Sequence, residues 1–112
     1  MNTKTFRTLD LAVEFYKATQ TLEVPKHLKD QLSKAASSVP MNLAEGNAKF
    51  SYKDKSRIYQ IAYGSLRECQ VIVRLAEIKD DQIESLSNRL GAAIYKLLQG
   101  VQSKIAENQN TV

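Results

Sequence analysis

The sequence predicts an all-α protein that folds as an up-and-down antiparallel four-helix bundle. Apolar residues recur every three or four positions along the chain, and nowhere do they alternate for long enough to indicate a strand. Only four glycines and two prolines occur in 112 residues, which favours long regular elements joined by short turns. The length predicts a single domain of residues 1–112, with an ordered core of about residues 6–105.

The first helix is expected over about residues 8–22, and the second begins at Pro25. The apolar face of the first helix consists of Phe6, Leu9, Ala12, Val13 and Tyr16. Pro25 separates the two helices, because the residue before a proline is pushed toward extended backbone geometry. Pro25 can then open the second helix, at a position where its missing N–H has no helical partner to lose.

The second helix carries a proline inside it, within the segment VPMNLAEG. Its apolar face consists of Leu28, Leu32, Ala35, Ala36, Val39 and Leu43. This arc passes through Pro40 without losing phase, so we expect the helix to continue through Pro40 with a kink, since Pro40 cannot donate to the carbonyl of Ala36. Gly46 is expected to cap the C-terminal end. We interpret Pro40, Asn42, Glu45 and Gly46 as a motif that shapes the chain, with Asn42 as a polar anchor, instead of an active site.

The third and fourth helices have recognisable starts. Ser51 with Asp54 approximates a capping box, and Asp80 with Asp81 favours a helix start through capping and charge. The inner face of the third helix is Ile58, Ile61, Ala62, Ser65, Leu66, Cys69, Ile72, Val73 and Ala76. The inner face of the last helix is Ile83, Leu86, Leu90, Ile94, Leu97, Leu98, Val101 and Ile105. The tail of residues 106–112 is polar and is expected to fray.

The residues do not favour catalysis. Cys69 is the single cysteine, so it forms no intrachain disulfide, and on an inner face it is more typical of a small buried hydrophobe than of a nucleophile. His27 and Cys69 do not make up the three or four ligands that zinc needs, and no glycine-rich phosphate loop occurs. We therefore expect no enzyme activity, no cofactor and no metal. The polar start and the lack of about 18 consecutive apolar residues predict a cytoplasmic protein without a membrane partner.

Two helices carry a second apolar stripe on the side away from the expected core. These stripes are Leu11, Phe15, Ala18 and Leu22 in the first helix, and Gly64, Val71, Leu75 and Ile78 in the third. A monomeric bundle needs one stripe on each helix, so the doubled stripes predict contacts between subunits of a homo-oligomer. The alternative is that these residues are scattered exposed apolar side chains.

Basic residues crowd the start of the third helix and follow one of its flanks. The candidate nucleic-acid-binding residues are Lys49, Lys53, Lys55, Arg57, Arg67 and Arg74. Tyr52, Tyr59 and Tyr63 lie among them, and such a mixture can pair phosphates and stack on bases. The net charge of +4 permits nucleic-acid binding without requiring it. The alternative is a solvated face with tyrosines packed at a subunit boundary.

Three short motifs resemble one family of small bacterial proteins. The first motif is QL, a basic residue and AA, followed by a segment of the form [VI]-P-x-N-[LI]-A-E-G. In this chain it consists of Gln31-Leu32, Lys34, Ala35-Ala36 and Val39-Pro40-Met41-Asn42-Leu43-Ala44-Glu45-Gly46. A second reads IA-x-GSL-x-E and is Ile61-Ala62, Gly64-Ser65-Leu66 and Glu68. The third is Phe6 with Leu9. The chain is similar, over about residues 6–100, to the four-helix-bundle proteins encoded within intervening sequences of large-subunit ribosomal RNA genes.

The resemblance implies a four-helix bundle, expected to be a homopentamer, with RNA or DNA as its partner. Relatives of that family include the accessory variability determinant of diversity-generating retroelements, a basic homopentamer that partners a reverse transcriptase and binds nucleic acid. Two hypotheses follow for this chain. It is either a non-enzymatic oligomer that binds nucleic acid, especially structured RNA, or a protein–protein adaptor or structural oligomer with a polypeptide partner.

Overall fold

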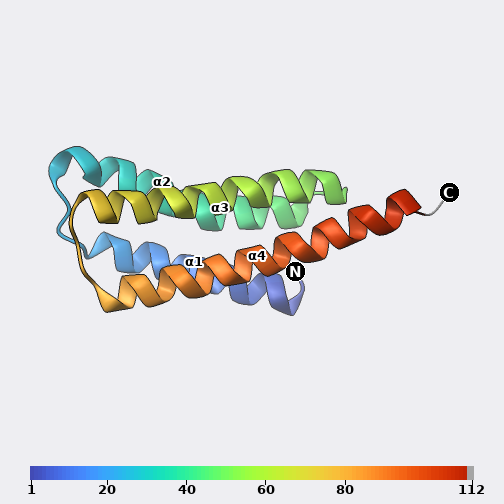
Figure 1. Ribbon diagram of the computed structural model, residues 1–112, viewed down its shortest axis with the longest axis horizontal. Coiled ribbons are helices and arrows are strands. Elements are labelled where there is room, and N and C mark those ends of the chain that lie inside the picture. The colour runs from blue at the N-terminus through green and yellow to red at the C-terminus, as the bar shows by residue number, and fades with distance from the viewer. Residues whose placement is uncertain (111–112) are drawn as a thin grey trace.

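The computed structural model describes residues 1–110, and these residues form four α-helices with no strand. The helices are α1 (Thr3–Gln20), α2 (Lys26–Ala48), α3 (Tyr52–Leu75) and α4 (Asp81–Asn110). They run alternately in opposite directions in a bundle with extents of 54 × 23 × 19 Å (Figure 1). Each helix packs against the next in sequence, and α4 closes the bundle against α1. The predicted all-α four-helix fold is therefore confirmed.

The core face of α1 differs from the predicted one. Phe6 and Val13 were expected to point inward, but they are 55% and 37% exposed, and α1 begins at Thr3, before the expected start. The residues of α1 that are buried are Thr5, Thr8, Ala12, Phe15 and Thr19. The helix is thus rotated by about one residue from its predicted orientation, and threonines occupy positions that a hydrophobicity pattern assigns to the surface.

Hydrogen bonds within α1 explain why threonine is tolerated inside the bundle. The Thr8 hydroxyl donates to the carbonyl of Lys4 at 2.9 Å, and the Thr19 hydroxyl donates to that of Tyr16 at 2.7 Å. These two buried hydroxyls therefore have partners one turn earlier, so only their methyl groups need an apolar environment. Phe15 is buried on the same face of α1 and is fully covered.

The burial of Phe15 corrects the predicted subunit interface on α1. Phe15 was assigned to a second apolar stripe that faces another subunit, but it belongs to the core of its own bundle. Leu11, Ala18 and Leu22 are partly buried and pack against the same core. The stripe on α1 is therefore mainly used within one chain and gives no separate surface for a partner.

Helix α2 continues through Pro40, in phase with its apolar arc. Leu32, Ala35, Ala36, Val39 and Leu43 are buried as expected, while Leu28 is partly buried. The bend at Pro40 stays a prediction.

A polar bridge next to Pro40 joins α2 to α3. The Asn42 amide donates to the carbonyl of Ser38 at 2.8 Å and contacts the Ser38 hydroxyl at 2.9 Å. The Ser38 hydroxyl lies 2.8 Å from that of Ser65 on α3. These three side chains help to fix the axial register of α2 against α3.

The role predicted for Gly46 is wrong. Gly46 does not end α2, which runs on to Ala48, and no glycine in the described residues has the positive φ of a left-handed cap. Gly46 is buried, and a Cβ atom added there would lie 2.7 Å from Cε1 and 2.8 Å from Cδ1 of Tyr59. Glycine is needed here because the Tyr59 ring on α3 packs directly on the α2 backbone.

The ends of α3 and α4 agree with the sequence in part. The Ser51 hydroxyl accepts a hydrogen bond from the backbone N–H of Asp54 at 3.1 Å, so Ser51 caps α3. An Asp80 carboxylate oxygen accepts from the backbone N–H of Ile83 at 2.9 Å, so Asp80 caps α4. Ile61 was expected inside but is 45% exposed. Residues 106–110 were expected to fray but continue α4, and the rest of that predicted tail, residues 111 and 112, lies outside the described residues.

The first prediction concerns the tight contact at Gly46. Replacing Gly46 with Ala should destabilise the protein by about 1–3 kcal/mol, because the new methyl group overlaps a buried aromatic ring. Gly100→Ala is the matched control, since a Cβ at this exposed α4 position meets nothing within 4 Å and should raise stability by up to about 1 kcal/mol. Urea unfolding followed by circular dichroism measures both changes, and equal midpoints for wild type and Gly46→Ala would contradict the packing described.

Candidate nucleic-acid interface

The six predicted basic residues do not form one patch. Lys49, Lys53 and Arg57 lie at the end of the bundle where α2 meets α3, whereas Arg67 and Arg74 lie farther along α3. At 1.5 Å per residue, Arg74 is about 30 Å along the helix from Lys53. The structure therefore divides the predicted site into an end surface and two separate arginines.

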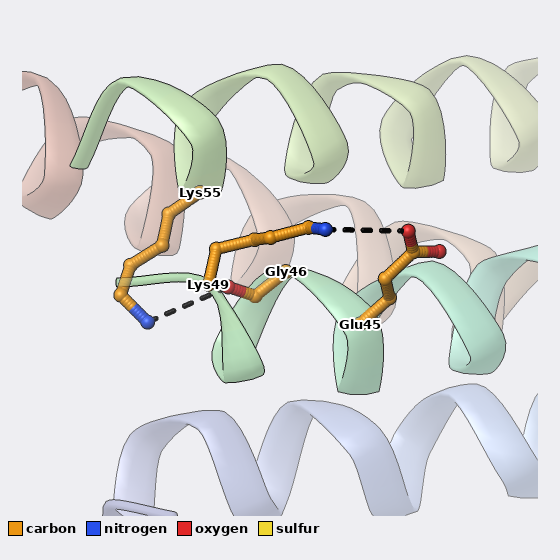
Figure 2. Close-up of polar contacts among 4 residues, drawn as sticks. All are labelled: Glu45, Gly46, Lys49 and Lys55. Atoms are coloured by element: carbon orange, nitrogen blue, oxygen red, sulfur yellow. Dashed lines mark hydrogen bonds and ion pairs between the residues drawn. The ribbon is translucent and has the colours of Figure 1, made fainter. Parts of the chain in front are cut away.

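Lys55 faces inward and caps α2. Its ammonium group donates to the carbonyl of Asn47 at 2.6 Å, and the side chain is partly buried. The same ammonium lies 3.4 Å from the carbonyl of Gly46 (Figure 2). A positive charge at the C-terminal end of a helix pairs with carbonyl groups that have no partner inside the helix. Lys55 is therefore held by the fold, and we remove it from the candidate interface.

Lys49 is paired with Glu45 across one turn at the end of α2. The ammonium lies 3.8 Å from a Glu45 carboxylate oxygen, and the two side chains are 36% and 55% exposed (Figure 2). An exposed ion pair of this kind contributes at most about 1 kcal/mol. A phosphate group can replace this weak partner, so Lys49 stays in the candidate interface and Glu45 is its local counter-charge.

Lys53 and Arg57 are the most available basic residues of the end surface. They are exposed, and they lie four residues apart on the outer side of α3. Within residues 1–110, neither makes a hydrogen bond or an ion pair to another side chain. Their donors remain directed to solvent, which is what phosphate contacts require.

Positive charge is concentrated at this end of the bundle. The segments that meet there are residues 1–10, 42–60 and 97–110, as the antiparallel arrangement requires (Figure 1). Together they carry seven Lys and Arg against four Asp and Glu, while residues 11–41 and 61–96 carry nine against eight. Three of the four net positive charges therefore belong to the end that holds the α2–α3 turn.

Arg67 is held in a defined position on the flank between α3 and α4. Its guanidinium donates to the Tyr63 hydroxyl at 2.6 Å and to the Gln70 amide oxygen at 2.9 Å, and it lies 4.9 Å from the centre of the Tyr63 ring. Two donors are thus engaged, and Arg67 and Tyr95 line the same groove. The geometry favours a fixed planar contact on this flank, separate from the end surface.

Arg74 lies in acidic surroundings at the opposite end of the bundle. It lines the groove between α3 and α4 near their connection, whose other charged residues are Glu77, Lys79, Asp80, Asp81 and Glu84. Four carboxylates against two cations disfavour a phosphate group there. The structure therefore does not support Arg74 as a phosphate-binding residue of the same site.

Sequence reasoning missed Phe50 on the end surface. Phe50 lies in the turn between α2 and α3, and its side chain is fully exposed. Tyr52 follows at the start of α3 and is 38% exposed. The signal was present in the sequence as KFSYK, in which two aromatic residues alternate with polar ones between two lysines, directly after the end of a helix.

The remaining reactive groups are buried or isolated. Burial, with a smaller contribution from the neighbouring Glu68 carboxylate, raises the pKa of the Cys69 thiol to about 12, so Cys69 stays protonated at neutral pH. Burial also raises the pKa of Tyr59, and a hydrogen bond with the Thr5 side chain opposes part of that rise. Across residues 1–110, no three His, Cys, Asp or Glu side chains are grouped so that they could hold a metal ion. None of the helices described has the length and apolar character needed to cross a membrane.

Fold and surface together define a class of small antiparallel four-helix bundles with a basic end and an uncharged core. The chain belongs to the family of 23S rRNA-intervening sequence proteins, whose family model matches residues 6–107. No curated protein and no solved structure matches the chain. The family predicted from the proline motif is therefore confirmed, and the match includes all of α2 and α3 and most of α1 and α4.

The second prediction separates Lys55 from Lys53. Lys55→Ala should lower the free energy of unfolding by about 1 kcal/mol, because the last carbonyls of α2 lose a charged donor. Lys53→Ala removes an exposed lysine that has no partner in the described residues and should change stability by less than about 0.5 kcal/mol. Chemical denaturation of both variants tests this difference. Equal effects would show that Lys55 does not stabilise the α2 end.

Proposed function

We propose that this protein is a non-enzymatic homo-oligomer that binds nucleic acid, structured RNA in particular, and acts in the cytoplasm. The observation that carries the proposal is the concentration of positive charge at the α2–α3 end, with Lys53 and Arg57 exposed and unpaired within the described residues. Family membership supports a connection with ribosomal RNA. We propose five subunits because the resemblance of the sequence motifs implies a pentamer.

Binding through this end would be electrostatic and largely independent of base sequence. Lys49, Lys53 and Arg57 can each contact a phosphate, since none is buried or firmly held by another group. One chain offers few such contacts, so its affinity alone would be weak. The proposal therefore needs several copies of the end surface to act together.

An exposed apolar patch on α3 supports the oligomer. Val71 and Leu75 are 56% and 65% exposed, Ile61 is also exposed, and nothing lies within 4 Å of a Cβ added at Gly64. These residues lie on the outer side of α3, which faces solvent in a monomer, so their apolar side chains would be buried only by a partner. Gly64 would let a neighbouring subunit approach the α3 backbone closely. Ile78, in the connection after α3, is partly buried and would lie at the edge of the patch.

The apolar patch and the basic residues share one side of α3. Lys53 and Arg57 precede Ile61 and Gly64 on the same outer side of the helix. In a cyclic oligomer whose axis runs along the bundles, every copy points in the same direction. The basic ends would then form one ring, and weak phosphate contacts would add up through avidity.

A second function rests on the same apolar patch. If a polypeptide other than a second copy covers Val71 and Leu75, the protein is a protein–protein adaptor or a structural oligomer without a nucleic-acid partner. The two proposals differ in their response to salt. Phosphate binding weakens steeply with salt concentration, whereas apolar contacts are little affected or strengthened.

The third prediction concerns assembly. Val71→Asp should reduce the molar mass in solution from that of an oligomer to the 12.6 kDa monomer without loss of helix content, because it places a charge in an apolar contact. Val13→Asp is the matched control, since Val13 is a partly exposed valine on α1, outside the patch, and should leave the mass unchanged. Light scattering and circular dichroism measure both properties. A monomeric wild type at micromolar concentration would contradict the proposal.

The fourth prediction concerns salt dependence. Lys53→Gln combined with Arg57→Gln should weaken RNA binding and reduce the slope of log affinity against log salt by about 1.4–1.8 for each bound subunit, at about 0.7–0.9 for each lost phosphate contact. Lys26→Gln with Lys29→Gln, at the other end of the bundle, is the matched control and should leave the slope unchanged. Filter binding at several salt concentrations gives the slopes. If the wild type binds no RNA at low salt, the adaptor function replaces this one.

A further inference from the structure

Phe50 is an aromatic side chain that the bundle itself does not use. It lies in the turn between α2 and α3, and its relative exposure of 104% means that no other residue covers the ring. Phe50 is the most exposed large apolar side chain in the described residues, and Tyr52 is exposed two residues later, so the turn presents two aromatic side chains to a partner. Lys49 and Ser51 are its neighbours in sequence, so the ring projects from a polar turn.

Phe50 opens onto a groove that α4 completes. Helix α4 runs past the ends of the other three helices on the side where α2 turns into α3 (Figure 1). The groove has a volume of about 470 Å³ and is lined by Phe50, Ser51, Tyr52 and Lys53 on one side, and by Ile105, Asn108 and Gln109 of α4 on the other. Two aromatic residues, a lysine and two residues with side-chain amides thus line one concave surface.

These groups match the chemistry of an unpaired nucleotide. An aromatic ring can stack on the face of any base, a lysine can contact the adjoining phosphate, and an amide can hydrogen-bond a base edge. The interior of a double helix does not offer its base faces to such a ring, because each base is already stacked on its neighbours. Stacking on Phe50 therefore selects unpaired bases in single-stranded segments, loops or overhangs.

We propose that Phe50 and Tyr52 form a stacking site for unpaired bases of single-stranded RNA, with Lys49 and Lys53 on the flanking phosphates. This inference rests on the proposed function and deepens it, because it names the part of an RNA that the basic end holds. The charge of the surface favours RNA as the occupant, since this end carries three of the four net positive charges and attracts a polyanion.

The test compares Phe50→Ala with Phe6→Ala, a matched loss of an exposed phenylalanine on α1 that does not line the groove. The probes are an unstructured 15-nucleotide RNA and a blunt-ended 15-base-pair RNA duplex at the same low salt concentration. Phe50→Ala should weaken binding of the single strand by about 5- to 100-fold, which corresponds to the loss of one stacked base. It should leave duplex binding and the salt slope unchanged, and Phe6→Ala should change neither affinity.

A second variant reports stacking directly. The chain contains no tryptophan, so Phe50→Trp introduces a single tryptophan, whose emission can be excited separately from that of the five tyrosines. The single-stranded RNA should quench its emission, and the duplex should not. Phe6→Trp provides the control position, at which neither RNA should change the emission.

The outcomes separate this inference from the proposed function. If the wild type binds RNA and Phe50→Ala binds the single strand equally well, the stacking site is wrong and the electrostatic function stands. An equal loss for single strand and duplex also overturns it, as does a fall in oligomer mass for Phe50→Ala, which would assign Phe50 to a subunit contact. A wild type that binds neither RNA overturns both proposals.

Discussion

The close contact between the backbone of α2 at Gly46 and the ring of Tyr59 on α3 is the constraint on which the rest of the structure depends. Only glycine leaves room for the ring, since an added Cβ would lie 2.7 Å from it. Farther along the two helices, the hydroxyl groups of Ser38 and Ser65 meet at 2.8 Å. These two points fix the spacing and the register of α2 and α3, and so they fix the short turn between them.

The functional surface follows from that turn. With α2 and α3 locked together, Lys55 reaches back to the last carbonyls of α2, while Lys53 and Arg57 are left on the outer side of α3. Phe50, in the short turn between them, is fully exposed to solvent. The same packing that stabilises the fold therefore sorts the basic residues into one that holds the helix end and others that remain available to a partner.

The helix periodicity was sufficient to predict the four-helix fold and most of the core, but it failed where polar groups satisfy one another locally. Thr8 and Thr19 are buried in α1 because their hydroxyls bond to the preceding turn, and this displaced the expected Phe6 and Val13 to the surface. Because α1 is rotated from its predicted orientation, Phe15 lies in the core and not at the expected subunit interface. No scale of single-residue hydrophobicity contains that information.

The candidate site was predictable in composition and not in geometry. A cluster of lysines and arginines can be read from the sequence, but whether Lys55 points to a carbonyl or to solvent depends on how two helices meet. Lys53 and Arg74 are likewise about 30 Å apart along α3. A helical wheel shows which side of a helix a residue lies on and hides that separation. Phe50 was missed because a turn residue has no periodic neighbours to mark it as exposed.

Hydrogen–deuterium exchange of the protein with and without single-stranded RNA, at low salt, tests the central claim most directly. The account predicts that RNA slows exchange in residues 49–57, at the turn and the first turns of α3, and in residues 105–109 of α4. Exchange around Arg74 and Asp81, at the opposite end of the bundle, should stay the same. Protection centred on that opposite end, with none at the α2–α3 turn, would contradict the account.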